Sequence, residues 1–152
     1  GTPRVAWMRS GSGGTEAWAA RFDGRWVSAR VAAGTDVYYP SGIVLDGRDE
    51  TRAALGVLRD GVCEIEEWVT PDGGRSWRFA FSYTRRSATH RFRPQYVKNG
   101  SDALPLFWLS ADKYTKWTSF STNLHTVVLE GVDSPLHPEP GAEGLPAAPA
   151  LP

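Results

Sequence analysis

The chain has 152 residues, enough for one domain with its own core, and its 17 Lys and Arg residues balance 17 Asp and Glu residues. This balance excludes the strongly basic surface that neutralising a nucleic-acid backbone requires. A single cysteine, Cys63, excludes an internal disulfide framework and a cysteine-rich zinc site, and no apolar run is long enough to span a bilayer. We therefore expect neither a nucleic-acid partner nor a membrane partner.

Short aromatic runs broken by Gly, Pro, Asn and Asp predict an all-β protein. The first predicted unit, at about residues 4–34, is a three-stranded meander. Its last two strands turn at Asp23-Gly24, a dipeptide that favours a tight hairpin. The predicted strands of this unit are residues 5–8, 15–22 and 25–31.

The second predicted unit, at about residues 35–88, is a four-stranded meander with the residue count of one propeller blade. Its predicted strands are residues 38–45, 52–58, 62–69 and 77–83. Residues 52–58 can be read as a helix, but Gly56 and the turn signals on both sides favour a buried strand. In the next strand Cys63 is expected to be a small buried residue.

Three glutamates follow Cys63 in that strand. Glu64 and Glu66 share one face and Glu67 lies on the other, which predicts an outer, solvated strand and no acid/base pair.

The third predicted unit, at about residues 89–131, has strands at residues 92–97, 104–109 and 124–129, with a further segment at 111–117. From residue 134 to 152 the chain is rich in Pro and Ala and cannot form a β-ladder. We expect this tail to be disordered or extended.

One turn in the second unit has a specific pattern, Ser/Thr-x-Asp-x-Gly-x-Ser/Thr followed by an aromatic residue. Asp accepts hydrogen bonds from nearby backbone N–H groups, Gly supplies a positive φ, and the aromatic ring packs beside the hairpin. The residues that fill the pattern are Thr70, Asp72, Gly74, Ser76 and Trp77.

This pattern resembles the Asp-box, or BNR repeat, of sialidase-type β-propellers. Runs at residues 39–46, 92–94, 107–110 and 114–118 are similar to the C-terminal blades of secreted BNR-containing proteins, which include sialidases and propeller-type polysaccharide lyases. In this family the box lies on the rim away from the substrate face, so the resemblance implies a structural role for Asp72.

The resemblance implies an incomplete β-propeller of about three blades, at about residues 4–34, 35–88 and 89–131. Three blades are too few to close a ring. We therefore expect the chain to be a piece of a longer protein, or a subunit that associates with the remaining blades. The resemblance also implies an extracellular or periplasmic location and an acidic polysaccharide or glycan as partner.

The first candidate site lies at the entry to an inner strand, in the run HRFRP. Arginines at such positions in the sialidase group clamp the substrate carboxylate, which makes Arg93, with Arg91 beside it, a substrate-binding candidate. His90 is a candidate general base or proton relay. The alternatives are a solvated edge arginine for Arg93 and a surface loop histidine for His90.

The second candidate site is the run KYTKW, in which an aromatic platform beside cations suits an acidic sugar. Lys113 and Lys116 are substrate-binding candidates, and Tyr114 is a candidate catalytic phenol. The alternative is a hairpin with Trp117 in the core and the lysines in solvent. Tyr39, which precedes another inner strand, is a weaker binding candidate.

The leading functional hypothesis is the C-terminal part of a carbohydrate-active propeller, acting on an acidic glycan as a polysaccharide lyase or a sialidase-like hydrolase. The alternatives are a non-catalytic propeller that binds glycan or protein, and a structural fragment without activity of its own. No metal-ligand spacing, phosphate-cradling loop or nucleophile elbow occurs, so we expect no metal and no cofactor.

Overall fold

The computed structural model describes residues 1–11, 14–35, 42–98, 105–111, 114–116, 119–120 and 122–126, with the backbone alone at 35, 114–116 and 119–120. These residues form 12 strands and no helix, so the all-β prediction is confirmed. The strands are β1 (Arg4–Gly11), β2 (Gly14–Phe22), β3 (Trp26–Thr35), β4 (Ile43–Leu45), β5 (Arg52–Arg59), β6 (Val62–Val69), β7 (Arg78–Ser82), β8 (His90–Tyr96), β9 (Leu106–Ala111), β10 (Tyr114–Lys116), β11 (Ser119–Phe120) and β12 (Asn123–Thr126).

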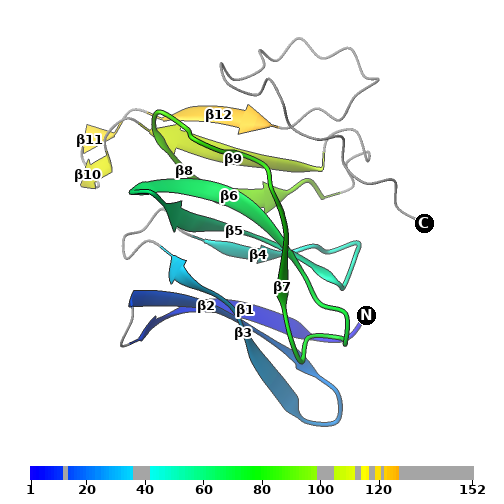
Figure 1. Ribbon diagram of the computed structural model, residues 1–152. Helices are drawn as coiled ribbons and strands as arrows, with labels where there is room; N and C mark the ends of the chain where they lie inside the picture. Colours follow the sequence, from blue (N-terminus) through cyan, green and yellow to red (C-terminus); the bar gives the residue numbers. More distant parts are fainter. Residues whose placement is uncertain are drawn as a thin grey trace.

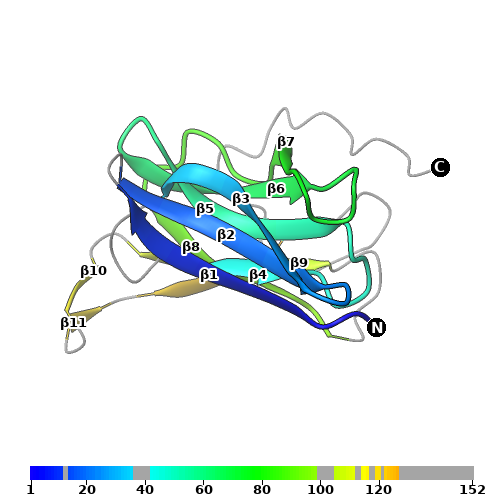
Figure 2. The same ribbon diagram turned by 90° about the horizontal axis from the view of Figure 1, so that it is seen from below.

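The strands form three antiparallel sheets and a separate β10–β11 hairpin. The first sheet has the order β1-β2-β3, the middle sheet β4-β5-β6-β7, and the third sheet β12-β9-β8. Figure 1 shows these sheets stacked face to face, with the middle sheet between the other two. Figure 2 shows β1 and β4 lying alongside each other across the first two layers.

Small apolar side chains fill the space between the first and middle sheets. Ala17 and Ala19 from β2 and Val31 from β3 meet Leu55 and Val57 from β5. Alanine side chains let two sheets approach closely while they exclude water. A second core separates the middle and third sheets, and it contains Ala54, Ile65, Tyr83, Leu106 and Trp108.

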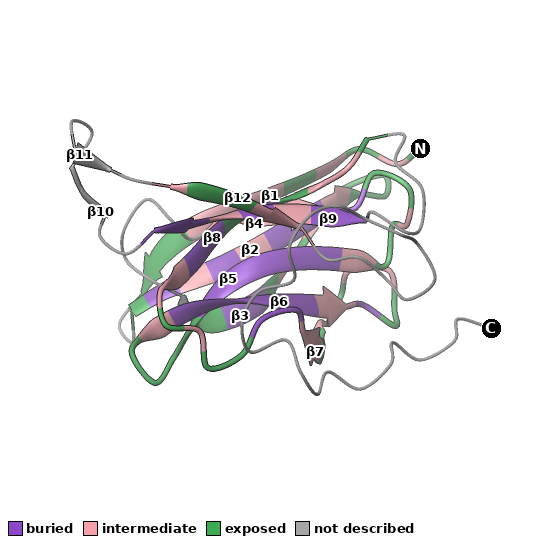
Figure 3. Cartoon of the chain, turned by 90° about the horizontal axis from the view of Figure 1, so that it is seen from above, coloured by how far each residue is buried: buried purple, intermediate pink, exposed green. Residues whose placement is uncertain are grey.

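Because β5 lies between two cores, its sequence does not alternate between apolar and polar residues. Ala53, Ala54, Leu55 and Val57 have no exposed surface, whichever face they occupy (Figure 3). A strand that is covered on both faces has a nearly continuous apolar sequence. The prediction of a strand over residues 52–58 is therefore confirmed, as is the burial of Cys63.

The middle sheet is the predicted four-stranded meander, and the other two sheets each have three strands among the described residues. In the third sheet β9 pairs with β12, so the β10–β11 hairpin is inserted between neighbouring strands. The third sheet is therefore not a meander of consecutive strands. The predicted tail at 134–152 lies outside the described residues.

The prediction of a solvated strand for the three glutamates is wrong. Glu64 is 3% exposed, and Glu66 and Glu67 are each 1% exposed. Glutamates on both faces predict a solvated outer strand, but β6 lies between two sheets and both of its faces are covered (Figure 3). Buried carboxylates are stable only when they are paired or hydrogen-bonded, and each of the three has its own set of partners.

The Glu67 carboxylate joins the middle and third sheets. Its Oε1 accepts a hydrogen bond from Arg52 of β5. Its Oε2 accepts from the phenols of Tyr83, at 2.9 Å, and Tyr96 of β8, at 2.8 Å. Arg52 also donates to the Tyr83 hydroxyl at 3.2 Å, and its Nη1 lies 3.8 Å from the Asp46 carboxylate.

The other two glutamates fix parts of the chain beside β6. Glu64 accepts hydrogen bonds from Thr84 and from the backbone and side chain of Ser87, which holds the connection between β7 and β8. Glu66 accepts two hydrogen bonds from Arg59, at 2.6 and 2.9 Å, and one from the Trp68 indole at 3.0 Å.

We expect the Glu67→Gln variant to lose about 3 kcal/mol of unfolding free energy, because it removes the buried carboxylate that is hydrogen-bonded to Arg52. Urea denaturation followed by tryptophan fluorescence measures this loss. Glu16→Gln is the matched control, because Glu16 likewise accepts three side-chain hydrogen bonds, from Arg9, Arg30 and the Trp18 indole. Its two arginine partners are more than half exposed. Equal losses in the two variants would contradict a special role for Glu67.

Candidate functional site

The turn between β6 and β7 is closed by the Asp72 carboxylate. Its Oδ1 accepts the backbone N–H groups of Arg75 and Ser76 at 3.0 and 2.8 Å, and its Oδ2 accepts the Ser76 hydroxyl at 2.6 Å. The Thr70 hydroxyl donates to Asp72 and accepts the N–H of Gly74, which has a φ of 90°. A side chain at this φ is strained, so the turn requires glycine.

The Asp72 carboxylate therefore has a structural role, because its hydrogen bonds close the turn. Hydrogen bonds from the Ser76 hydroxyl and backbone N–H hold the pKa of the Asp72 carboxyl at about 2, below its ordinary value of 3.8. A carboxylate this acidic stays ionised and is a poor proton acceptor at neutral pH.

The turn also contacts the neighbouring sheet. Trp77 packs against the core between the first and middle sheets. Arg21, near the end of β2, lies directly over the turn, and a Cβ added to Gly73 would be 2.6 Å from its Nη1. The turn between β6 and β7 therefore joins two sheets as well as two strands.

Arg93 lies in a bulge of β8. The register between β8 and β9 shifts between Phe92 and Gln95, and Arg93 has a φ of 52°. Its neighbours Phe92 and Pro94 are buried, whereas Arg93 is exposed. The bulge therefore turns Arg93 outward between two buried neighbours. Arg93 lies beside the start of β4, because a Cβ added to Gly42 would be 4.0 Å from the Arg93 Cα.

The other two predicted residues of this strand face inward. His90 is half-buried, and its Nδ1 accepts a hydrogen bond from the backbone N–H of Cys63 at 3.2 Å. In the neutral ring this bond places the proton on Nε2, so Nε2 is a hydrogen-bond donor. Arg91 is 5% exposed and donates to the Thr89 hydroxyl, so it does not share a surface with Arg93.

The second predicted site is described only in part. Tyr39 and Lys113 lie outside the described residues. Tyr114 and Lys116 lie in β10, which pairs with β11, and only their backbone is described. Their proposed roles stay predictions.

Two polar groupings were missed by sequence reasoning. In the first, burial, together with the Glu67 carboxylate, raises the pKa of the Tyr83 and Tyr96 phenols far above the ordinary value of 10. These phenols therefore stay protonated and donate to Glu67. In the second, the Ser110 hydroxyl lies 2.5 Å from His125 Nε2.

The Ser110–His125 pair depends on the register of the third sheet. His125 lies opposite Trp108, which brings its ring diagonally to Ser110, 15 residues away in the sequence. The His125 ring also stacks on Trp108, with 6.4 Å between the ring centroids. No sequence signal specifies this register.

Comparison with family models, curated proteins and solved structures finds no match to this chain. Among the described residues, no group of three or more His, Cys, Asp or Glu side chains is arranged to hold a metal ion. The same part of the chain contains no helix of the length and apolarity that crossing a membrane requires.

We expect the pKa of Asp72 to be visible in a carboxyl-detected NMR titration. Since its folded-state pKa is lowered, ionised Asp72 stabilises the fold fully above about pH 4, and this contribution is lost as the pH falls towards 2. The titration should give a midpoint near pH 2 for Asp72, and Ser76→Ala should raise that midpoint because it removes one donor. A midpoint near pH 4 in both proteins would show that the turn does not hold the carboxylate.

Proposed function

We propose that the chain is part of an Asp-box β-propeller that binds acidic glycans, with Arg93 as the residue that binds a glycan carboxylate. The observation that carries this proposal is the bulge in β8, which holds an exposed arginine in a strained backbone conformation beside the start of β4. The three stacked antiparallel sheets and the Asp-box turn support the propeller part of the proposal.

The strand directions support the assignment of two successive blades. β8 runs parallel to β6, because His90 meets Cys63 near the start of β6 and Tyr96 meets Glu67 near its end. Since β4, β5 and β6 alternate in direction, β4 and β8 run parallel in adjacent sheets. This is the relation expected of the innermost strands of two neighbouring blades.

The first sheet takes a different position in the proposed propeller. Arg4 at the start of β1 donates to the Asp46 carbonyl just after the end of β4, at 2.7 Å, so β1 runs opposite to β4. A strand with this direction occupies the second position of a blade. We therefore propose that the first sheet supplies the three outer strands of its blade.

The chemistry of Arg93 fits an acidic sugar. A guanidinium group can donate two parallel hydrogen bonds to one carboxylate, which selects for both charge and planar geometry. A non-glycine residue in the left-handed region costs about 1–2 kcal/mol. Such a cost is common at binding sites, where a particular side-chain direction is needed.

The proposal extends from binding of an acidic glycan to its cleavage. In a lyase, a cation such as Arg93 neutralises the uronate while a base removes the proton α to it. His90, three residues away in β8, is the candidate proton donor to the leaving oxygen, because its Nδ1 accepts the Cys63 N–H and the neutral ring carries its proton on Nε2. Tyr114 is then the candidate base. A sialidase-like hydrolysis needs a tyrosine nucleophile, and Tyr114 is the candidate for it.

We expect Arg93→Ala to weaken binding to a uronate oligosaccharide by tenfold to about a hundredfold, because it removes charge-assisted hydrogen bonds. Calorimetric titration with an oligogalacturonate measures this change. Arg86→Ala is the matched control, because Arg86 is also exposed and also has a φ of 52°. Unchanged affinity in Arg93→Ala, or equal losses in both variants, would contradict the assignment.

A second variant separates binding from folding. Arg93→Gly should be more stable than Arg93→Ala by about 1 kcal/mol, because glycine accepts the positive φ, yet it should bind the oligosaccharide no better. Urea denaturation and the same titration test both expectations. Absorbance from an unsaturated uronate product, and release of a fluorophore from a sialoside, then show whether bound glycan is cleaved.

A further inference from the structure

The first and middle sheets repeat one arrangement of side chains. An arginine and a tryptophan indole both donate to one glutamate, which lies seven residues after the arginine and two before the tryptophan. These residues are Arg9, Glu16 and Trp18 in the first sheet and Arg59, Glu66 and Trp68 in the middle sheet. In both sheets the pairing with the following strand shifts register immediately before the tryptophan, although the preceding hairpins differ in register. β1, β2 and β3 therefore correspond to β5, β6 and β7, and among the described residues the first sheet has no counterpart of β4.

The edge of β1 that faces away from β2 has unpaired backbone groups. The Pro3 carbonyl accepts the N–H of Phe22 at 2.9 Å, and β1 pairs with β2 without a register shift. Because hydrogen-bonded and non-hydrogen-bonded pairs alternate along an antiparallel ladder, the N–H and C=O groups of Ala6, Met8 and Ser10 point away from β2. Within the described ranges no strand pairs with this edge, whereas β4 pairs with the corresponding edge of β5.

Of the edge strands in the described part of the chain, β1 alone is both long and regular. β3 has two register shifts, β7 has five residues and one shift, and β8 contains Pro94 and a bulge. β4, β10, β11 and β12 have four residues or fewer. β1 has eight residues, no proline and no shift, and Figure 2 shows it at the margin of its sheet. Natural proteins shorten, bulge or cover their sheet edges, so a long regular edge is suited to pair with a further strand.

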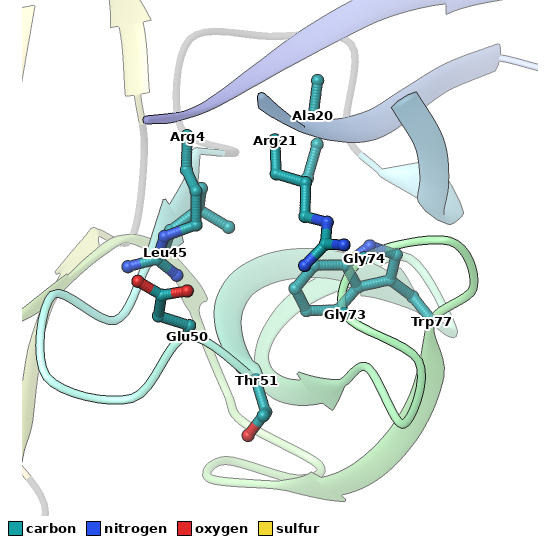
Figure 4. A pocket seen from close by; sticks show the side chains of 10 residues that line it. Arg4, Ala20, Arg21, Leu45, Glu50, Thr51, Gly73, Gly74 and Trp77 are labelled. Atoms are coloured by element: carbon teal, nitrogen blue, oxygen red, sulfur yellow. The ribbon is translucent and has the colours of Figure 1, made fainter. Parts of the chain in front are cut away.

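The neighbouring layer leaves room for that strand. In the middle sheet β8 packs against β5, with the Arg52 guanidinium 5.7 Å from the centre of the Tyr96 ring, while β4 still pairs with β5. β4 has the same relation to β1. The Arg4 side chain extends from β1 towards Leu45 (Figure 4) and donates to the Asp46 carbonyl at 2.7 Å. A strand beside β1 therefore occupies the place that β4 has beside β5.

The side chains along this edge select an apolar strand. Ala6 and Met8 point towards the middle sheet and are half-buried. Val5 and Trp7 alternate with them on the outer face, where Val5 is 44% exposed. A strand paired with β1 places side chains beside both sets, so apolar residues suit both of its faces. The sequence of β4, Ile43–Leu45, meets this requirement.

We propose that β1 binds a short apolar strand supplied by the rest of the propeller. The strand runs antiparallel to β1, as β4 does to β5, and therefore parallel to β4 and β8. Its backbone hydrogen bonds go to Ala6 and Met8. The proposal rests on the assignment of the first sheet as the three outer strands of a blade, and it identifies the surface and the chemistry of the strand that completes that blade.

The test uses the 152-residue chain labelled with ¹⁵N and a synthetic peptide with the sequence of residues 39–48, which includes β4. Backbone amide hydrogen exchange, followed by NMR, is the measurement. At a peptide concentration ten times the dissociation constant, exchange at Ala6 and Met8 should slow about tenfold, because the bound chain does not expose these amides. Exchange at Val5 and Trp7, which already donate to β2, should change less.

The control peptide carries Val44→Pro. Bonds on either side of Val44, from Gly56 to Gly42 and from Asp46 to Arg52, show that the Val44 N–H points towards β5 in the chain. The control peptide lacks this donor and should leave exchange unchanged.

Three outcomes would overturn the proposal. One is unchanged exchange in β1 with the first peptide, or equal effects of the two peptides. Another is chemical-shift changes confined to β5, which would show that the peptide replaces β4. The third is protection of β1 that rises with the concentration of the chain alone, which would show that two copies pair through this edge.

Ala6→Pro removes one N–H from the open edge and keeps the pairing of β1 with β2, so it should weaken peptide binding by more than tenfold. Ser28→Pro is the matched control and should leave the affinity unchanged. Asp23 donates to the Arg25 carbonyl at 2.9 Å, so the Ser28 N–H also points away from β2, at the open edge of β3. If Ala6→Pro loses the dispersed spectrum of a folded protein, the two peptides on the unchanged chain decide the question. β1 and Arg93 lie in different sheets, so the oligogalacturonate titration gives its result independently.

Discussion

The burial of the Glu67 carboxylate is the constraint on which the arrangement of the sheets depends. A carboxylate removed from water must be paired and hydrogen-bonded, and here the partners come from three different segments: Arg52 in β5, Tyr83 after β7 and Tyr96 in β8. All of these groups must lie within hydrogen-bond distance of one carboxylate. The third sheet is thereby held at a defined position on the middle sheet, and β8 brings Arg93 to its place beside Gly42.

Local chemistry made much of the fold predictable from the sequence. Turn residues separate the strands, and the spacing from Thr70 to Trp77 specifies a particular hydrogen-bonded turn. The environment of the glutamates was not predictable in this way. Alternation along a strand assigns residues to two faces, but it does not say whether a third layer covers the second face. The continuous apolar run in β5 indicates that both faces of the sheet are covered, and β6 is the neighbouring strand of that sheet.

The candidate sites likewise depend partly on residues that are close in the sequence and partly on the pairing of distant strands. The resemblance to the sialidase group suggested Arg93 as a candidate, but its outward direction depends on a bulge that only the pairing of β8 with β9 reveals. Ser110 and His125 meet through the register of β9 and β12. A cavity between the first and middle sheets is lined by Arg4 of β1, Arg21 of β2 and Trp77 just before β7, so no sequence motif could have predicted it.

The proposal that this chain binds acidic glycans through β8 is tested most directly by the location of the ligand contact. Backbone amide shifts of the ¹⁵N-labelled chain, recorded during titration with a uronate tetrasaccharide, report that location residue by residue. The account predicts saturable shifts clustered at residues 90–96 and at Gly42, with no comparable shifts at 70–77 in the turn between β6 and β7. Shifts confined to that turn, or no saturable shift in β8, would contradict it.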